Sequence, residues 1–180
     1  MIRKLSLALC LASAAFVGHS QAFAGSVSAP AFQAKAHIDP NCTISVAGDL
    51  DFGAYDPLQA NATAAKTGST SLTLTCTRGS GSTINLSSST NFGTGLAGKR
   101  AMTNGTSSLS YDLFWPDAVG ASAAATATPW GDGTTSGNGL VVAAAPSIAA
   151  RTVMVFGSIP AGQDASTGVY SDSVVATVNF

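Results

Sequence analysis

The sequence contains no glutamate, and only 9% of its residues are charged. Its acidic residues are nine aspartates, and eight Lys and Arg leave a net charge of −1. So little positive charge provides neither a basic patch for nucleic acid nor a cationic amphipathic helix for a membrane surface. The lack of Glu and of Leu-rich heptads also argues against long helices. We expect a surface covered by Ser, Thr, Asn, Gly and Ala.

Histidine is also scarce, and this limits the chemistry available to the chain. Beyond residue 24 the one histidine is His37, with no acid or nucleophile at a recognisable spacing, so no Ser-His-Asp arrangement is predicted. Asp49 and Asp51 are explained more simply by a turn before Phe52 than by acid–base catalysis. Asp132 lies between two glycines and predicts a tight turn, since the ligand series of a calcium-binding EF-hand is absent. We therefore predict no enzyme activity, no metal and no cofactor.

Residues 1–24 are predicted to be a secretory signal peptide. Arg3 and Lys4 precede an apolar run, and Ala-Phe-Ala at 22–24 fits the small-x-small pattern of a cleavage site. The apolar run is too short to remain in a bilayer as a spanning helix, so no membrane segment is expected after the signal is removed. The chain is thus expected to be exported.

Two cysteines remain after signal removal, Cys42 and Cys76. An even pair in an exported protein predicts one disulfide, worth about 4 kcal/mol for a loop of this length in the chain-entropy model. Structural zinc normally takes four ligands, more than these two cysteines and one histidine supply. The remaining chain is long enough for one domain with a modest core.

Short apolar and β-branched runs recur between Gly, Asp, Asn and Pro along this domain. This spacing predicts an all-β fold, an antiparallel sandwich. The expected strands cover residues 42–46, 50–53, 69–76, 83–86, 108–115, 139–142, 151–157 and 169–180. The Ala-, Thr- and Gly-rich stretch between Pro116 and Gly139 is expected to be a long surface loop, with a short strand or helical turn in its Ala run.

The two ends of the mature chain both alternate apolar and polar residues. Near the N-terminus, Phe32, Ala34, Ala36 and Ile38 share one face of a predicted strand, and Gln33, Lys35 and His37 share the other. The C-terminal run 168–180 is expected to be a half-buried strand that ends on a buried phenylalanine, with one face formed by Tyr170, Val174, Ala176, Val178 and Phe180. Such strands at opposite ends suggest subunits that complete one another.

A set of short motifs in a fixed order resembles a known family. They occupy residues 42–44, 50–55, 72–77, 99–102, 109–113, 130–133, 155–163, 168–172 and 177–180, and include Leu-Asp-Phe-Gly-Ala-Tyr and the C-terminal Thr-Val-Asn-Phe. Together they resemble the spore coat protein U domain, the pilin module of archaic chaperone–usher (Csu-type) pili. The C-terminal Asn-Phe differs from the penultimate Tyr of classical pilins and fits the archaic branch.

The resemblance implies an incomplete immunoglobulin-like sandwich that lacks its final strand. It implies a signal peptide at 1–24, an N-terminal extension with a donor strand at 25–41, and a spore coat protein U (pilin) domain at 42–180. A periplasmic chaperone would hold the subunit through its C-terminal strand. An outer-membrane usher would then pass it to neighbouring pilus subunits, each completed by the next subunit's donor strand. The expected destination is the cell surface, with roles in adhesion and biofilm formation.

Three alternatives remain open from the residues alone. In the first, residues 32–38 are the domain's own first strand, fully paired within one subunit. In the second, the chain is a self-complete secreted sandwich that binds a surface ligand such as a glycan through the 116–139 loop and the neighbouring Trp115 and Trp130. The family name also implies a protective coat component of resting cells.

Overall fold

The computed structural model describes residues 25–116, 124–135 and 137–180. The predicted signal peptide lies outside these residues. The chain divides into two units, Met1–Ala36 and His37–Phe180. In the first unit, the described residues 25–36 are exposed and contain neither helix nor strand. The second unit contains every described strand and the hydrophobic core.

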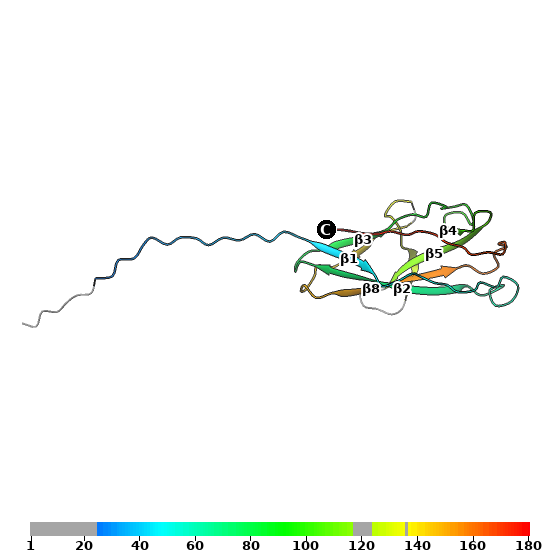
Figure 1. Ribbon diagram of the computed structural model, residues 1–180, viewed down its shortest axis with the longest axis horizontal. Coiled ribbons are helices and arrows are strands. Elements are labelled where there is room, and N and C mark those ends of the chain that lie inside the picture. Colours follow the sequence, from blue (N-terminus) through cyan, green and yellow to red (C-terminus); the bar gives the residue numbers. More distant parts are fainter. Residues whose placement is uncertain (1–24, 117–123, 136) are drawn as a thin grey trace, which may run out of the picture. The chain divides into compact units, whose positions relative to one another are not determined.

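The second unit is an antiparallel β-sandwich, as the sequence predicts (Figure 1). The larger sheet has the strand order β1-β2-β8-β5-β4, with β6 also paired to β5. Its strands are β1 (Cys42–Val46), β2 (Lys66–Cys76), β4 (Arg100–Thr103), β5 (Ser108–Pro116), β6 (Ala124–Pro129) and β8 (Arg151–Ile159). The smaller sheet has the order β7-β3-β9, with β3 (Ser82–Leu86), β7 (Leu140–Val142) and β9 (Ala176–Asn179).

The core forms where alternating apolar residues of the two sheets face one another. In β2, Leu72, Leu74 and Cys76 are buried, and Val153 and Val155 of the neighbouring β8 lie on the same face. Because successive side chains of a strand point to opposite faces, the Ser and Thr residues between these positions face away from the core. Each of these two strands therefore presents one apolar face to the core.

The predicted disulfide is confirmed. Cys42 and Cys76 are paired directly across β1 and β2, with their Cα atoms 4.1 Å apart, and their sulfurs are bonded. This bond attaches β1, an edge strand of the larger sheet, to the neighbouring strand β2. That edge of the sheet is thereby held in place.

Some strand predictions need correction. No strand forms at 50–53, because the Asp51 carboxylate instead accepts the Gly53 N–H at 2.7 Å, in a turn where Gly53 has φ +65°. The C-terminal strand is limited to β9, and Phe180 is 56% exposed rather than buried, because it lies beyond the last residue that pairs with β3. Two strands were not predicted with definite bounds, β4 and β6; the latter forms in the Ala-rich run.

Trp130 connects the two sheets rather than facing solvent. Its side chain is fully buried, and its indole N–H donates to the Ile84 carbonyl at 2.9 Å. Asp132 forms the predicted turn, accepting the N–H groups of Thr134 and Thr135 at 2.9 and 2.6 Å. A glycan-binding surface built on Trp130 is therefore not available in this structure.

Candidate functional site

The sandwich is open where the two sheets end. β1 is the edge strand of the larger sheet and β9 is the edge strand of the smaller one, and neither is hydrogen-bonded to the other. Ser87 N–H donates to the Val175 carbonyl at 2.8 Å, so the neighbouring backbone groups of Val174 and Ala176 point away from β3. Those groups are available to a further strand.

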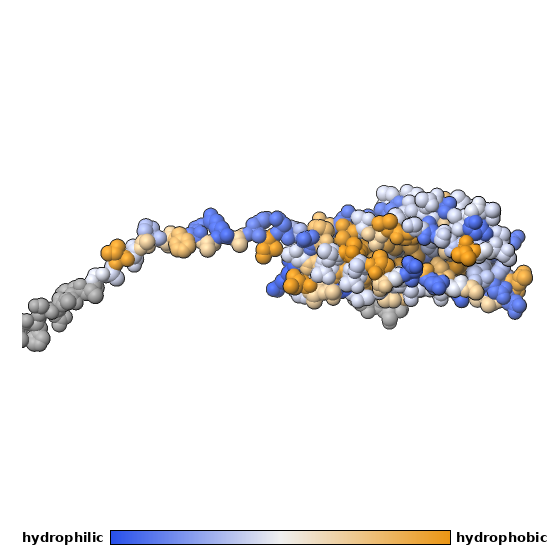
Figure 2. Space-filling view, viewed as in Figure 1, coloured by the Kyte–Doolittle hydropathy of each residue, from blue (hydrophilic) through white to orange (hydrophobic). Residues whose placement is uncertain are grey.

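A groove lies between the segment that follows β1 and the segment that precedes β9. Its first wall is residues 46–58, which continue from β1, and its second wall is residues 165–176, which lead into β9. Two cavities of about 530 and about 680 Å³ make up the groove. Both are lined by the same five residues, Leu50, Asp51, Phe52, Met102 and Tyr170, which we call the waist. Figure 2 shows hydrophobic residues gathered on the face of the domain that carries β1 and the C-terminal segment.

The two walls run in opposite directions. From the first cavity to the second, the first wall advances from Val46 to Leu58, whereas the second wall goes back from Ala176 to Ala165. A strand inserted between them must therefore be parallel to one wall and antiparallel to the other. Both arrangements satisfy backbone hydrogen bonds, so the groove has the geometry of a missing strand.

The first wall rests on a pair of glycines. Gly68 of β2 and Gly157 of β8 are cross-strand partners, and Leu50 and Phe52 lie over them. A Cβ on Gly157 would come within 2.5 Å of Phe52 Cζ, and one on Gly68 within 3.2 Å of Leu50 Cδ2. The absence of side chains at these two positions allows the first wall to lie against the sheet without being a strand.

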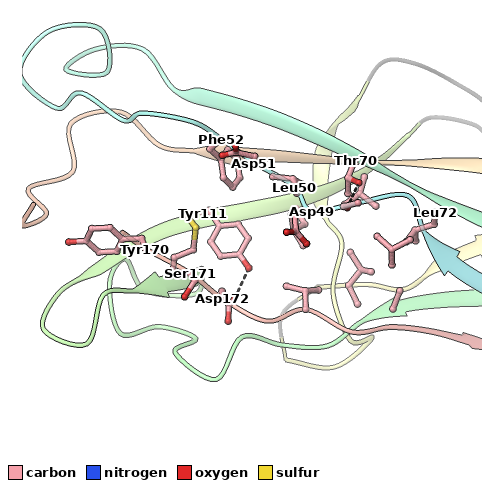
Figure 3. A pocket seen from close by; sticks show the side chains of 18 residues that line it. Asp49, Leu50, Asp51, Phe52, Thr70, Leu72, Tyr111, Tyr170, Ser171 and Asp172 are labelled. Carbon is pink, nitrogen blue, oxygen red and sulfur yellow. Dashed lines mark hydrogen bonds between the residues drawn. The ribbon is translucent and has the colours of Figure 1, made fainter. Parts of the chain in front are cut away.

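Tyr111 of β5 forms the floor between the walls (Figure 3). Its ring makes an edge-on contact with Phe52, with centroids 6.0 Å apart, and its hydroxyl donates to the Asp172 carboxylate at 2.6 Å. Burial, and then the bond to Asp172, raise the pKa of the Tyr111 phenol well above its usual value. Tyr111 thus contacts both walls and stays protonated at neutral pH.

Arg100 of β4 supports the same region from inside the domain. It is 2% exposed, and its guanidinium donates to the carbonyls of Leu86, Ser87 and Trp130. Burial lowers the pKa of Arg100, whereas the neighbouring Tyr111 and Asp172 oppose that change. The buried cation therefore fixes the end of β3, which in turn binds the second wall.

A second set of hydrogen bonds fixes the far end of the groove. The Tyr55 hydroxyl donates to the Pro160 carbonyl at 2.8 Å and accepts the Gln163 N–H at 3.0 Å. The Gln163 side-chain amide exchanges two bonds of 2.8 Å with the backbone of Ser110. These contacts join residues 50–55 to residues 155–163, two motifs that the sequence alone did not connect.

The predicted C-terminal face lies along the second wall. Tyr170, Val174 and Ala176 line the groove, and Val178 packs against the core further along β9. Before β9 the segment is held by Ser171, which exchanges backbone hydrogen bonds of 3.0 and 3.1 Å with Thr103. Asp172, Leu50, Phe52, Met102 and Tyr111 were not among the predicted site residues. The alternation of Leu50 and Phe52 with Asp49 and Asp51 is the sequence signal that could have identified the first wall.

The predicted donor residues are exposed and lie outside every described strand. Phe32 and Ile38 are 92% and 79% exposed, Ala34 and Ala36 are exposed as well, and residues 25–41 form no strand. The structure thus has no strand at residues 32–38. Donation to a second subunit stays a prediction at this point.

The described residues give no support to a catalytic or metal site. The His37 imidazole contacts Asp39 at 2.7 Å, with both side chains exposed. Within residues 25–116, 124–135 and 137–180, no group of three His, Cys, Asp or Glu could hold a metal ion. The same residues include no helix of the length and apolarity needed to cross a membrane.

Comparison with known proteins agrees with the motif resemblance. The Spore Coat Protein U domain model matches residues 29–177. The chain belongs to this family. Protein U of Myxococcus xanthus is 31% identical over 190 residues, an alignment that covers 98% of each chain.

A solved structure is also similar in part. It is the CsuC–CsuE chaperone–tip adhesion subunit pre-assembly complex from archaic chaperone–usher Csu pili of Acinetobacter baumannii. The similarity has a TM-score of 0.48 at 20% identity, and covers 79% of this chain and 40% of that chain. The predicted family and the predicted all-β sandwich are both confirmed, on the family match and on the fold described above.

Proposed function

We propose that this chain is a structural pilus subunit that polymerises by donor-strand exchange. The observation that carries the proposal is the groove between the two walls, which adjoin the edge strands β1 and β9 and carry hydrophobic residues. An open edge beside exposed apolar surface aggregates unless another strand covers it. A strand of a neighbouring subunit would pair with both edges and place alternate side chains in the two cavities.

The N-terminal extension has the properties that such a donor needs. Its alternating face of Phe32, Ala34, Ala36 and Ile38 is exposed and unpaired in its own subunit. Burying each large side chain in a neighbour's groove would contribute about 1.5–3 kcal/mol. Pro40 lacks an N–H and restricts Asp39, so the donor strand would end before β1 begins.

A periplasmic chaperone and an outer-membrane usher are the partners that this function requires. The second wall and β9 would carry chaperone capture, because they form one open side of the groove with which a partner strand can pair. The chaperone would supply a temporary strand, and the usher would exchange it for the next subunit's extension. Export by the signal peptide and display at the cell surface complete this path, with adhesion and biofilm formation as the roles of the polymer.

A coat component is a second candidate, favoured by the match to Protein U and by the name of the domain. It would use the same groove and the same extension, because a coat also requires subunits that join. Immunogold labelling of surface fibres against labelling of a continuous cell layer distinguishes the two. The groove is equally required for both.

An unheated detergent gel tests the proposed polymerisation. The exported chain, co-produced with a periplasmic chaperone and usher, should run as a ladder that collapses to one band after boiling. A single band in both lanes from folded, disulfide-bonded protein would contradict donor-strand exchange.

A further inference from the structure

The groove is acidic, and the predicted donor strand carries a basic residue at its middle. Among the described residues that line the groove there are four aspartates and no Lys, Arg or His. The extension, residues 25–41, carries Lys35 and His37 within the donor strand and one acid, Asp39, which follows the strand and contacts the His37 imidazole at 2.7 Å. We infer that the groove accepts the extension of a second copy of this same chain, with Lys35 facing Asp49 and Asp51. This inference rests on the proposed function and names its partner.

The sizes of the side chains agree with this pairing. The donor face reads large, small, small, large: Phe32, Ala34, Ala36 and Ile38. The groove has a cavity on each side of the waist, whose residues line both cavities. The two alanines would cross the waist while the two large side chains enter the two cavities. This register places residue 35, the middle of the strand, at the middle of the groove.

The direction of the side chains then brings opposite charges together. Leu50 and Phe52 are half-buried toward the groove, whereas Asp49 and Asp51 alternate with them and are exposed. Lys35 lies between the two inward-facing alanines and would therefore point outward on the same side as these aspartates. Cross-strand neighbours of opposite charge attract, and like charges repel. An extension with an acid at position 35 would be disfavoured.

The four aspartates differ in whether they are already engaged. Asp51, Asp56 and Asp172 accept hydrogen bonds from Gly53, Leu58 and Tyr111, respectively. Asp49 has no partner among the residues that the structure describes. Asp49 is therefore the residue best placed to receive Lys35.

The test uses two synthetic peptides of residues 29–41 as probes, one native and one with Lys35→Glu and His37→Glu. The acceptor is the mature full chain with Phe32→Asp and Ile38→Asp, whose own extension cannot compete. At low salt the native peptide should bind roughly fivefold to tenfold more tightly than the inverted peptide. At 1 M salt the Debye screening length falls to about 3 Å, so the two peptides should bind with almost equal affinity.

The outcomes separate the inference from the proposed function. If both peptides bind equally at every salt concentration, the groove accepts strands but does not select its own, and the inference fails alone. If neither peptide binds a folded acceptor, donor-strand exchange itself fails.

A charge exchange in the polymerising chain provides a second test that does not depend on an empty acceptor. Lys35→Glu should weaken the unheated ladder, and adding Asp49→Lys to the same chain should restore it. Asp51→Asn retains the turn to Gly53, so it can be combined with Asp49→Lys without disturbing the first wall. Arg78→Glu, outside the groove, is the matched charge control and should leave the ladder unchanged. Failure of Asp49→Lys to restore the ladder would overturn the assigned pairing.

Discussion

Gly157 leaves space that the ring of Phe52 occupies. A Cβ at Gly157 would lie 2.5 Å from Phe52 Cζ and 2.8 Å from Phe52 Cε1, closer than carbon atoms approach one another. Gly68, its partner across the strands, leaves similar space beside Leu50. Two glycines of the central strands therefore determine where the first wall of the groove lies.

We predict that Gly157→Ala displaces Phe52 and impairs both stability and assembly. Overpacking of this kind costs about 1–3 kcal/mol, which lowers the melting temperature of a chain of this length by roughly 2–12 °C. Thermal unfolding followed by circular dichroism measures the change.

Gly81→Ala is the matched control. The nearest atom to a Cβ at Gly81 is the Val142 carbonyl oxygen at 4.0 Å, so its melting temperature should not fall by a comparable amount. Adding Phe52→Ala to Gly157→Ala should recover part of the lost stability, since it removes the colliding ring. A Gly157→Ala chain with unchanged melting temperature and assembly would mean that Phe52 does not depend on this space.

The burial of Tyr111 and its bond to Asp172 predict a loss of stability in alkali. The raised pKa of Tyr111 means that folding favours the protonated phenol, whose ordinary pKa is 10.0. That contribution is complete below pH 10 and is lost progressively as the pH rises toward the higher pKa of the folded state. Urea unfolding of the wild type between pH 9 and pH 11 should show the decline.

Tyr111→Phe should be less stable at pH 7 by about 1 kcal/mol, because it loses the bond to Asp172. It should also lose less stability above pH 10 than the wild type does. Tyr170→Phe removes a hydroxyl bonded to the Ser166 carbonyl at 2.7 Å and should keep the alkaline decline of the wild type. Parallel alkaline curves for Tyr111→Phe and the wild type would contradict this role of the phenol.

Much of the sandwich could be predicted because local patterns determine it. Alternation of apolar residues identified β2 and β8, and the cysteine pair identified the bond between β1 and β2. β4 was missed because its four residues include a buried arginine, and the burial of Arg100 depends on the distant carbonyls of Leu86 and Trp130. A short window of sequence carries no information on such partners.

The sequence predicted only one of the two walls of the groove. The alternation of residues 170–178 indicated the second wall, since β9 and the segment before it form an edge. The first wall was expected to be a strand, yet Leu50 and Phe52 alternate without one. Their position depends on Gly68 and Gly157, which are far away in the sequence and adjacent only after β2 and β8 pair. The floor residue Tyr111 was missed for the same reason.

Deletion of residues 173–180 should prevent accumulation of the subunit. It removes β9, which pairs with β3, and exposes Ile84 and Leu86 at a new open edge. It also removes the strand that we propose the chaperone captures. Pulse-chase labelling should show rapid degradation or aggregation, and the truncated chain should not co-purify with the chaperone.

Deletion of Phe180 alone is the milder control, because that residue is exposed and lies outside β9. Soluble accumulation of the 173–180 deletion as a monomer would count against this role of the C-terminal segment.

Replacing Phe32 and Ile38 with Asp should separate polymerisation from folding. Both side chains are exposed in their own subunit, so the double variant should form the Cys42–Cys76 disulfide and melt within about 2 °C of the wild type. In a neighbour's groove the same changes would put two charges into apolar cavities, at a cost above the roughly 1.5–3 kcal/mol that each native side chain contributes. Fibres and the unheated ladder should therefore disappear while chaperone binding remains.

The matched control for this pair is Gln33→Asp, on the opposite face of the extension. It adds a charge to the same segment but would not enter the cavities, so assembly should continue at a reduced rate. Electron microscopy of the cell surface and the thermal transition of the purified subunit are the two measurements. A double variant that loses its fibres together with its fold would show that residues 32–38 stabilise their own domain. Loss of fibres by an intact subunit is the result that donor-strand exchange requires.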